Sequence, residues 1–134
     1  MSEVEVLISP KIGRGYSSTT AHAAKANGFL FVTGQVAVKP GQDGAKARGE
    51  ISDMGTIEEQ TVRVLENIKV ILEEAGTTFD NVVKRNIYLT HAGDFDAVHK
   101  VLEDYFNPIA TTTVVTGLIP TSSKIEIEVI AVVP

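Results

Sequence analysis

The chain has 134 residues, the size of one domain, and it contains no cysteine, which excludes disulfides, thiolate metal sites and cysteine nucleophiles. Its 17 acidic and 12 basic residues give a formal net charge of -5, which argues against a protein that binds nucleic acid through its phosphates. No apolar run approaches the roughly 18 to 20 residues of a membrane span, and the first ten residues lack the basic segment of a signal peptide. We therefore expect a single cytoplasmic domain over residues 1–134 that binds neither nucleic acid nor membranes.

The first third of the chain predicts strands and loops. Residues 4–8 form a short strand candidate, and residues 10–19 predict a loop because they contain proline, glycine and several hydroxyl groups. The stretch "TAHAAKANGFLFVTGQVAV" predicts a hairpin with Asn27 and Gly28 in its turn, since both residues tolerate positive φ. The polar stretch "KPGQDGAKARG" predicts an exposed loop.

A long amphipathic helix is predicted to begin near Thr56. Thr56 and Glu59 have the spacing of a capping box, in which each side chain accepts a hydrogen bond from the other residue's amide. Apolar residues recur at helical spacing from Ile57 to Ala75. Gly76 follows at the position where a left-handed residue commonly ends a helix.

The second half predicts a strand, a helix and two closing strands. Residues 81–90 form a strand candidate, residues 93–106 a second amphipathic helix capped near Asp94, and Pro108 follows this helix. The runs "TTTVVTGL" and "KIEIEVIAVV" predict the last strands. The fold class is therefore α/β (α+β), with one mixed sheet of about six strands and both helices on one face. The other face carries apolar residues, which predicts burial against another subunit.

The final strand carries the strongest chemical signal. Glu126 and Glu128 lie two residues apart, so both side chains point to one face, while Ile125 and Ile127 point to the other. A carboxylate on an apolar strand either sits at a solvated sheet edge or acts as a general acid/base at a pocket rim. Both interpretations stay open, with Glu126 favoured over Glu128 for chemistry.

Other polar residues have weaker signals. The hydroxyl run of Thr111, Thr112 and Thr113 suits an ordinary strand, and a hydroxyl-lined pocket is the alternative. The histidine spacing does not match a metal site; we expect His22 nearest to a site and His99 on the surface. The basic stretches "KIGR" and "VKRN" are expected to be solvated.

At "FLFVTGQVAV", "ENIKVILEEAG", "GDFDAVHKVLEDYF" and "IPTSSKIEIEVIAV", the chain resembles the Rid/YjgF family of reactive intermediate deaminases over nearly its whole length. The resemblance implies a chorismate-mutase-like homotrimer with a pocket at each subunit interface. It also implies hydrolysis of small imines, such as 2-iminopropionate, without a cofactor or a metal.

Carried over residue by residue, the resemblance places several chain positions in the pocket. Glu126 matches the family's pocket glutamate, and Thr33, beside Gly34, matches the serine of its "SGQ" stretch. Thr111 stands where the family has an arginine that clamps the substrate carboxylate, and Thr113 where it often has cysteine. Thr20 stands in place of a tyrosine.

The missing arginine shapes the expected function. Tyr16 lies four positions before the family's tyrosine, and Arg14, Lys84 or Arg85 could supply a cation from another direction, but no pattern places them there. We expect a divergent hydrolase or deaminase of a small imine, enamine or related C–N substrate, different from the standard 2-imino acid deaminase. The alternative is a trimer that binds a small molecule without catalysis; ribonuclease activity is disfavoured by the acidic charge and the absence of a histidine pair.

Overall fold

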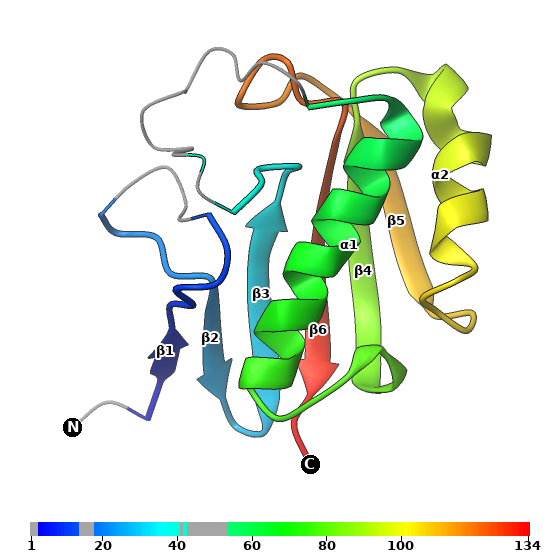
Figure 1. Ribbon diagram of the computed structural model, residues 1–134. Coiled ribbons are helices and arrows are strands. Elements are labelled where there is room, and N and C mark those ends of the chain that lie inside the picture. Colours follow the sequence, from blue (N-terminus) through cyan, green and yellow to red (C-terminus); the bar gives the residue numbers. More distant parts are fainter. Residues whose placement is uncertain (1–2, 14–17, 41, 43–53) are drawn as a thin grey trace.

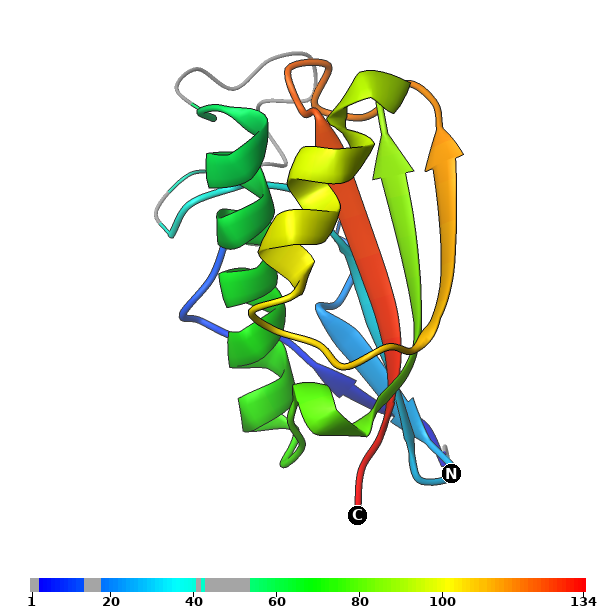
Figure 2. The same ribbon diagram turned by 90° about the vertical axis from the view of Figure 1, so that its right-hand side faces the viewer.

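The computed structural model describes residues 3–13, 18–40, 42 and 54–134 and contains one six-stranded sheet covered on one face by two helices (Figures 1 and 2). The sheet has the order β1-β2-β3-β6-β4-β5, in which only the β4–β5 pair is parallel. The predicted mixed sheet with both helices on one face is confirmed. The strands are β1 (Glu5–Leu7), β2 (Ala23–Ala26), β3 (Phe29–Gln35), β4 (Val82–Leu89), β5 (Ala110–Val115) and β6 (Ile125–Val132).

The hairpin between β2 and β3 forms where the sequence predicts it. Asn27 has φ 57° and Gly28 has φ 81°, the left-handed conformations that a two-residue hairpin turn requires. The antiparallel register pairs Ala26 with Phe29 on either side of this turn. The turn therefore fixes which side chains of β3 face the helices.

Helix α1 (Ile57–Glu74) is held at its start by the predicted capping box. The amide of Glu59 donates to Thr56 Oγ1 at 3.2 Å, and the amide of Thr56 donates to Glu59 Oε1 at 3.0 Å. The hydrogen bond from the Thr56 backbone lowers the pKa of the Glu59 carboxyl. At the other end Gly76 has φ 83°, as expected for a residue that ends a helix.

The core lies between the helices and the sheet, and β6 is in the middle of that sheet. Ile125, Ile127 and Val129 are buried under the helices, while Glu126 and Glu128 point to the opposite face. Because β6 pairs with both β3 and β4, the interpretation of the two glutamates as a solvated sheet edge is wrong.

Helix α2 (Phe95–Leu102) is shorter than the predicted 93–106. A 3-10 turn, η2 (Ala92–Asp94), precedes it, and Asp94 makes no side-chain capping bond. After Leu102 the chain turns so that Phe106 packs edge-on against Phe79, with ring centroids 4.9 Å apart. Aromatic packing against η1 (Phe79–Asn81) therefore replaces the last predicted helical turn.

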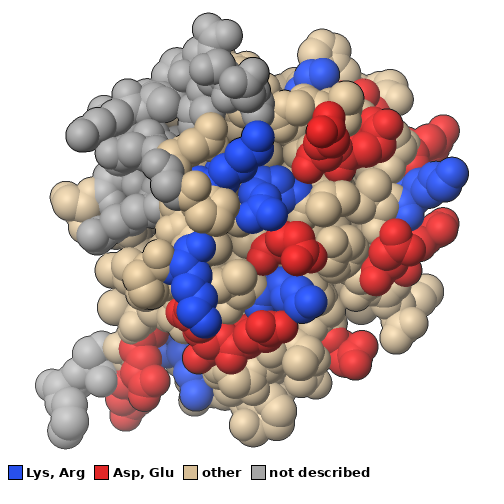
Figure 3. All heavy atoms as spheres, viewed as in Figure 1, with Lys and Arg blue, Asp and Glu red and all other residues tan. Residues whose placement is uncertain are grey.

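The sheet face without helices, here called the open face, combines apolar and polar side chains. The strand registers align Val6, Phe31 and Ile130 in one row across it, and Val6 and Phe31 are 68% and 47% exposed. On the helix-covered side, acidic and basic side chains are interspersed over the described surface (Figure 3). Within the described residues, no helix combines the length and apolarity that crossing a membrane requires.

Candidate active site

Glu126 is the open-face residue with the most unusual environment. Its side chain is half-buried on the central strand β6 and makes no hydrogen bond to a described residue. Burial, and secondly the nearby negative charge of Glu128, raise the pKa of the Glu126 carboxyl above its ordinary value of 4.5. A carboxyl held in this way changes its protonation state closer to neutral pH than an exposed glutamate does.

Gly34 makes room for this carboxyl. The β3–β6 register is interrupted between Val32 and Gln35, so the backbone of β3 departs from regular pairing at Gly34. A Cβ atom on Gly34 would overlap Glu126 Oε2 and would lie 2.9 Å from Glu126 Cδ. Glycine at this position therefore lets the Glu126 carboxyl lie directly against the β3 backbone.

Glu128, two residues along the same strand, has a different environment. Its Oε1 accepts a hydrogen bond from the Tyr88 hydroxyl at 2.5 Å and another from Asn86 Nδ2 at 3.2 Å. The hydrogen bond to Glu128 raises the pKa of the Tyr88 hydroxyl. The two glutamates thus divide into one that is fixed by β4 side chains and one, Glu126, that remains available to a ligand or to water.

Thr33 and Thr20 lie near each other at the end of β3. The Thr33 hydroxyl donates to the Ala21 carbonyl at 2.6 Å, so its proton is already used and it offers a ligand only acceptor capacity. Thr20 is half-buried beside Ala21. Tyr16 and Arg14 lie outside the described residues.

Thr111 and Thr113 point away from Glu126. In the parallel β4–β5 register they pair with Arg85 and Ile87, whose side chains face the helices. The intervening Thr112 receives a hydrogen bond from Lys84 Nζ at 2.7 Å, which fixes the alternation. Within a single chain, Glu126, Gly34 and Thr33 therefore lie together, whereas Thr111 and Thr113 lie on the other side of the sheet.

Two residues expected to be solvated are not. Arg85 is 8% exposed, and both its Nε and His99 Nε2 are buried without a hydrogen-bond partner among the described residues. Arg85 could have been placed by alternation, because it shares the inward phase of Ile87 and Leu89. His99 depends on how α2 packs against β4, which the sequence pattern did not reveal.

His22 has a structural role. The ring is buried, its Nδ1 accepts from the Ser9 amide at 2.8 Å, and its Nε2 lies 2.8 Å from the Gly13 carbonyl. Because Nδ1 accepts, the proton is on Nε2 and is donated to Gly13. Both nitrogens thus fix the loop after β1, and neither is left for a ligand.

No group of three or more His, Asp or Glu side chains in the described part of the chain could hold a metal ion. The polar groups of the open face are carboxyls, hydroxyls and amides. Groups of these kinds can transfer protons and position water.

Comparison with known proteins gives consistent matches over the whole fold. The family model described as "Endoribonuclease L-PSP" matches residues 10–133. A RutC family protein of Aquifex aeolicus is 34% identical and one of Pyrococcus abyssi 41% identical, and each match covers over 80% of both chains. The crystal structure of a conserved Rid-family protein of unknown function from Yersinia pestis superposes with a TM-score of 0.83 at 30% identity, covering 97% of this chain and 99% of that one.

Proposed function

Because this chain belongs to the Rid/YjgF family of Endoribonuclease L-PSP-like proteins, we propose that it hydrolyses a small imine, enamine or related C–N substrate with Glu126 as the acid/base residue. The observation that carries the proposal is the half-buried Glu126 carboxyl, which lies against Gly34 with a raised pKa and without a hydrogen-bond partner among the described residues. Such a carboxyl takes up and releases a proton at a higher pH than an exposed glutamate does.

The proposed reaction adds water across the C=N bond. The ionised Glu126 takes one proton from water as the oxygen attacks the imine carbon, and the protonated carboxyl gives that proton to the nitrogen, which forms a carbinolamine. The carboxylate then takes the proton of the carbinolamine hydroxyl and passes it to the nitrogen as the C–N bond breaks and the C=O bond forms. The products are a carbonyl compound and ammonia or an amine. Atoms and charge balance without an oxidant, a metal or a cofactor.

The charge of the site favours a substrate with a neutral or positively charged reacting group. Glu126 and Glu128 share the open face, and two carboxylates attract an iminium ion. Thr111, in the position that the resemblance assigns to a carboxylate-binding arginine, carries no charge. We therefore propose a substrate other than the standard 2-imino acids.

We further propose that the active protein is a homotrimer with its pockets between subunits. The exposed apolar row on the open face gives each chain a surface to bury. Because β5 is the edge strand of the sheet, contact between chains at that edge would also allow Thr111 and Thr113 of one subunit to approach Glu126 of another. If the protein does not turn over a substrate, the alternative function is that the same trimer binds a small molecule without catalysis.

Imine hydrolysis with semicarbazide as the trap for unhydrolysed imine tests the proposal. Imines would be generated in situ from an uncharged amine and from alanine, and offered to the wild type, Glu126→Gln, Gly34→Ala and the matched control Glu128→Gln. We expect hydrolysis of the uncharged imine by the wild type and Glu128→Gln, and a loss of about 100-fold in Glu126→Gln and Gly34→Ala. Equal rates in Glu126→Gln and the wild type would overturn the assignment of Glu126, and no turnover of any imine would favour the non-catalytic alternative.

Thr111→Arg tests the substrate preference separately. Restoring a cation at this position should raise the hydrolysis of 2-iminopropionate relative to the uncharged imine. A wild type that already prefers 2-iminopropionate would contradict the proposed preference and leave the role of Glu126 untouched.

A further inference from the structure

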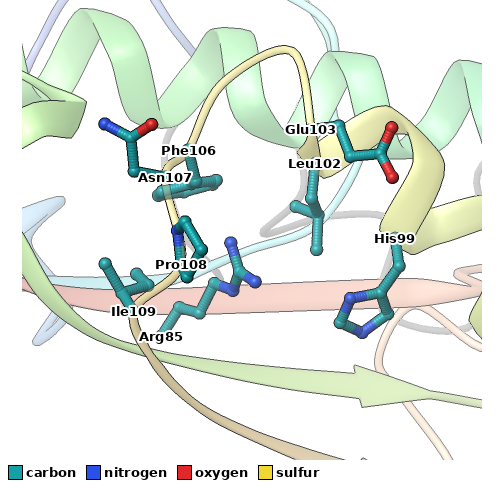
Figure 4. Close-up of a pocket in the computed structure, with 8 residues that line it drawn as sticks. All are labelled: Arg85, His99, Leu102, Glu103, Phe106, Asn107, Pro108 and Ile109. Atoms are coloured by element: carbon teal, nitrogen blue, oxygen red, sulfur yellow. The ribbon is translucent and has the colours of Figure 1, made fainter.

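A cavity of about 370 Å³ lies on the helix-covered side of the sheet, between α2, the turn that follows it and β4 (Figure 4). This volume is within the usual range for sites that bind small molecules. One part of its wall is apolar and is formed by Leu102, Phe106, Pro108 and Ile109. Arg85 points to the helix-covered side of β4, whereas Glu126 points to the open face from the adjacent strand β6. The sheet therefore separates this cavity from Glu126.

Arg85 is the positively charged group among the described residues that line the cavity. Figure 4 shows its guanidinium reaching between Phe106 and Pro108 on one side and His99 on the other. The guanidinium carbon lies 4.7 Å from the centre of the Phe106 ring, and Nε has no hydrogen-bond partner among the described residues. Burial lowers the pKa of Arg85, but a guanidinium stays protonated at neutral pH.

A buried cation without a counter-ion is unfavourable, and an anion entering the cavity would remove that cost. The side chain is 8% exposed, so its position is set by packing before any ligand arrives. Phe106 lies against the guanidinium, whose planar fork of N–H donors suits a planar acceptor. A carboxylate is the common biological group with that shape.

His99 provides a second polar group in the same cavity. Its ring lies on Phe95 with centroids 4.1 Å apart, and its Nε2 is buried without a partner in the described chain. Burial, and secondly the charge of Arg85, lower the pKa of His99, so the ring is neutral at pH 7. The ring therefore adds no second positive charge to the cavity.

We propose that this cavity is a binding site for a small monocarboxylate with a short apolar side group. The carboxylate would pair with the Arg85 guanidinium, and the apolar group would contact Leu102, Phe106 and Ile109. One fixed positive charge matches one negative charge, and the exposed carboxylate of Glu103 at the rim disfavours a dianion such as phosphate. The proposal does not depend on catalysis by Glu126.

Titration of the full-length protein with isobutyrate tests this site. Isobutyramide, which has the same shape without the charge, and inorganic phosphate serve as comparison ligands, with binding followed by calorimetry and by the thermal unfolding midpoint. Arg85→Met removes the cation, and Ile109→Trp fills the cavity while keeping Arg85. Lys100→Met is the matched control, because it removes one positive charge from the exposed side of α2.

We expect isobutyrate to bind the wild type and Lys100→Met with affinities within about twofold of each other. Binding should weaken roughly 10- to 100-fold in Arg85→Met and be lost in Ile109→Trp. Without ligand, Arg85→Met should unfold at a higher temperature than the wild type because it no longer buries a charge that has no ion-pair partner among the described residues. Glu126→Gln should bind isobutyrate like the wild type, which separates this site from the proposed reaction.

Three results would overturn the proposal. The first is isobutyrate binding that survives in Arg85→Met, and the second is equal binding of isobutyrate and isobutyramide. The third is an absence of saturable isobutyrate binding to the wild type. Tighter binding of phosphate than of isobutyrate would likewise overturn the assignment of the ligand as a monocarboxylate.

Discussion

Glu126 and Glu128 are chemically identical residues on one strand, and their neighbours give them different properties. Glu128 accepts hydrogen bonds from Tyr88 and Asn86, whereas Glu126 is held against Gly34 without such a bond. The sequence placed both side chains on one face through alternation. It could not distinguish them, because the difference depends on the pairing of β6 with β4 and β3.

The raised pKa of Glu126 has a consequence for stability. A carboxyl whose pKa is higher in the folded than in the unfolded protein stabilises the fold fully below its unfolded pKa, near 4.5, and that contribution is lost as the pH rises through the folded pKa. Glu126→Gln, which stays neutral, should therefore be more stable than the wild type at pH 7. The difference should shrink as the pH falls towards 4.5.

Urea unfolding of the wild type and Glu126→Gln at a series of pH values measures this difference. Glu128→Gln is the matched control, because it keeps an oxygen at the position that accepts from Tyr88 while removing the nearby charge. A wild type that is more stable than Glu126→Gln at pH 7 would show that the Glu126 carboxylate is stabilised in the fold, contrary to the raised pKa.

At the scale of elements, local signals located α1 and the β2–β3 hairpin closely. The capping box at Thr56 and Glu59 and the turn at Asn27 and Gly28 each act within four residues, so the sequence alone is sufficient to predict them. The end of α2 was overestimated because packing of Phe106 on Phe79, a contact between distant segments, determines it.

The capping box also gives a prediction for α1. Thr56→Ala removes the oxygen that accepts from the Glu59 amide and should lower the free energy of unfolding by about 1 kcal/mol. Thr56→Ser keeps that oxygen and should retain most of the stability. Chemical denaturation of the wild type and the two variants measures these free energies of unfolding. Equal midpoints for Thr56→Ala and the wild type would mean that tertiary packing alone fixes the start of α1.

The patterns that predict single helices and strands could not predict the cavity beside Arg85, because it depends on how β4 and β5 pair. Arg85 and Thr111 are 26 positions apart in sequence but are direct neighbours in the β4–β5 register. Thr111 stands where the resemblance places an arginine, and its direct partner on the adjacent strand is the cation Arg85. Only the parallel pairing of the two strands brings these positions together.

At the scale of the whole molecule, the open face predicts self-association. Phe31 is 47% exposed in the middle of the apolar row, and a lysine there should prevent burial of the face. We expect the wild type to elute with the mass of a trimer and Phe31→Lys with that of a monomer in light-scattering chromatography. Val62→Lys, an equivalent change at an exposed position of α1, is the control and should remain trimeric.

Two results would contradict this prediction. A monomeric wild type would remove the need for a partner on the open face. A trimeric Phe31→Lys would place the subunit contacts on another surface.

The pH dependence of imine hydrolysis by the wild type and Glu126→Gln shows whether the Glu126 carboxylate activates water. If the ionised Glu126 activates water, kcat/KM for an uncharged imine should fall on the acid side with a midpoint above 4.5, in the direction of the raised pKa. This acid limb should be absent from the small residual rate of Glu126→Gln. An unchanged acid limb and an unchanged rate in Glu126→Gln would show that another group carries the proton and that Glu126 is not the acid/base residue.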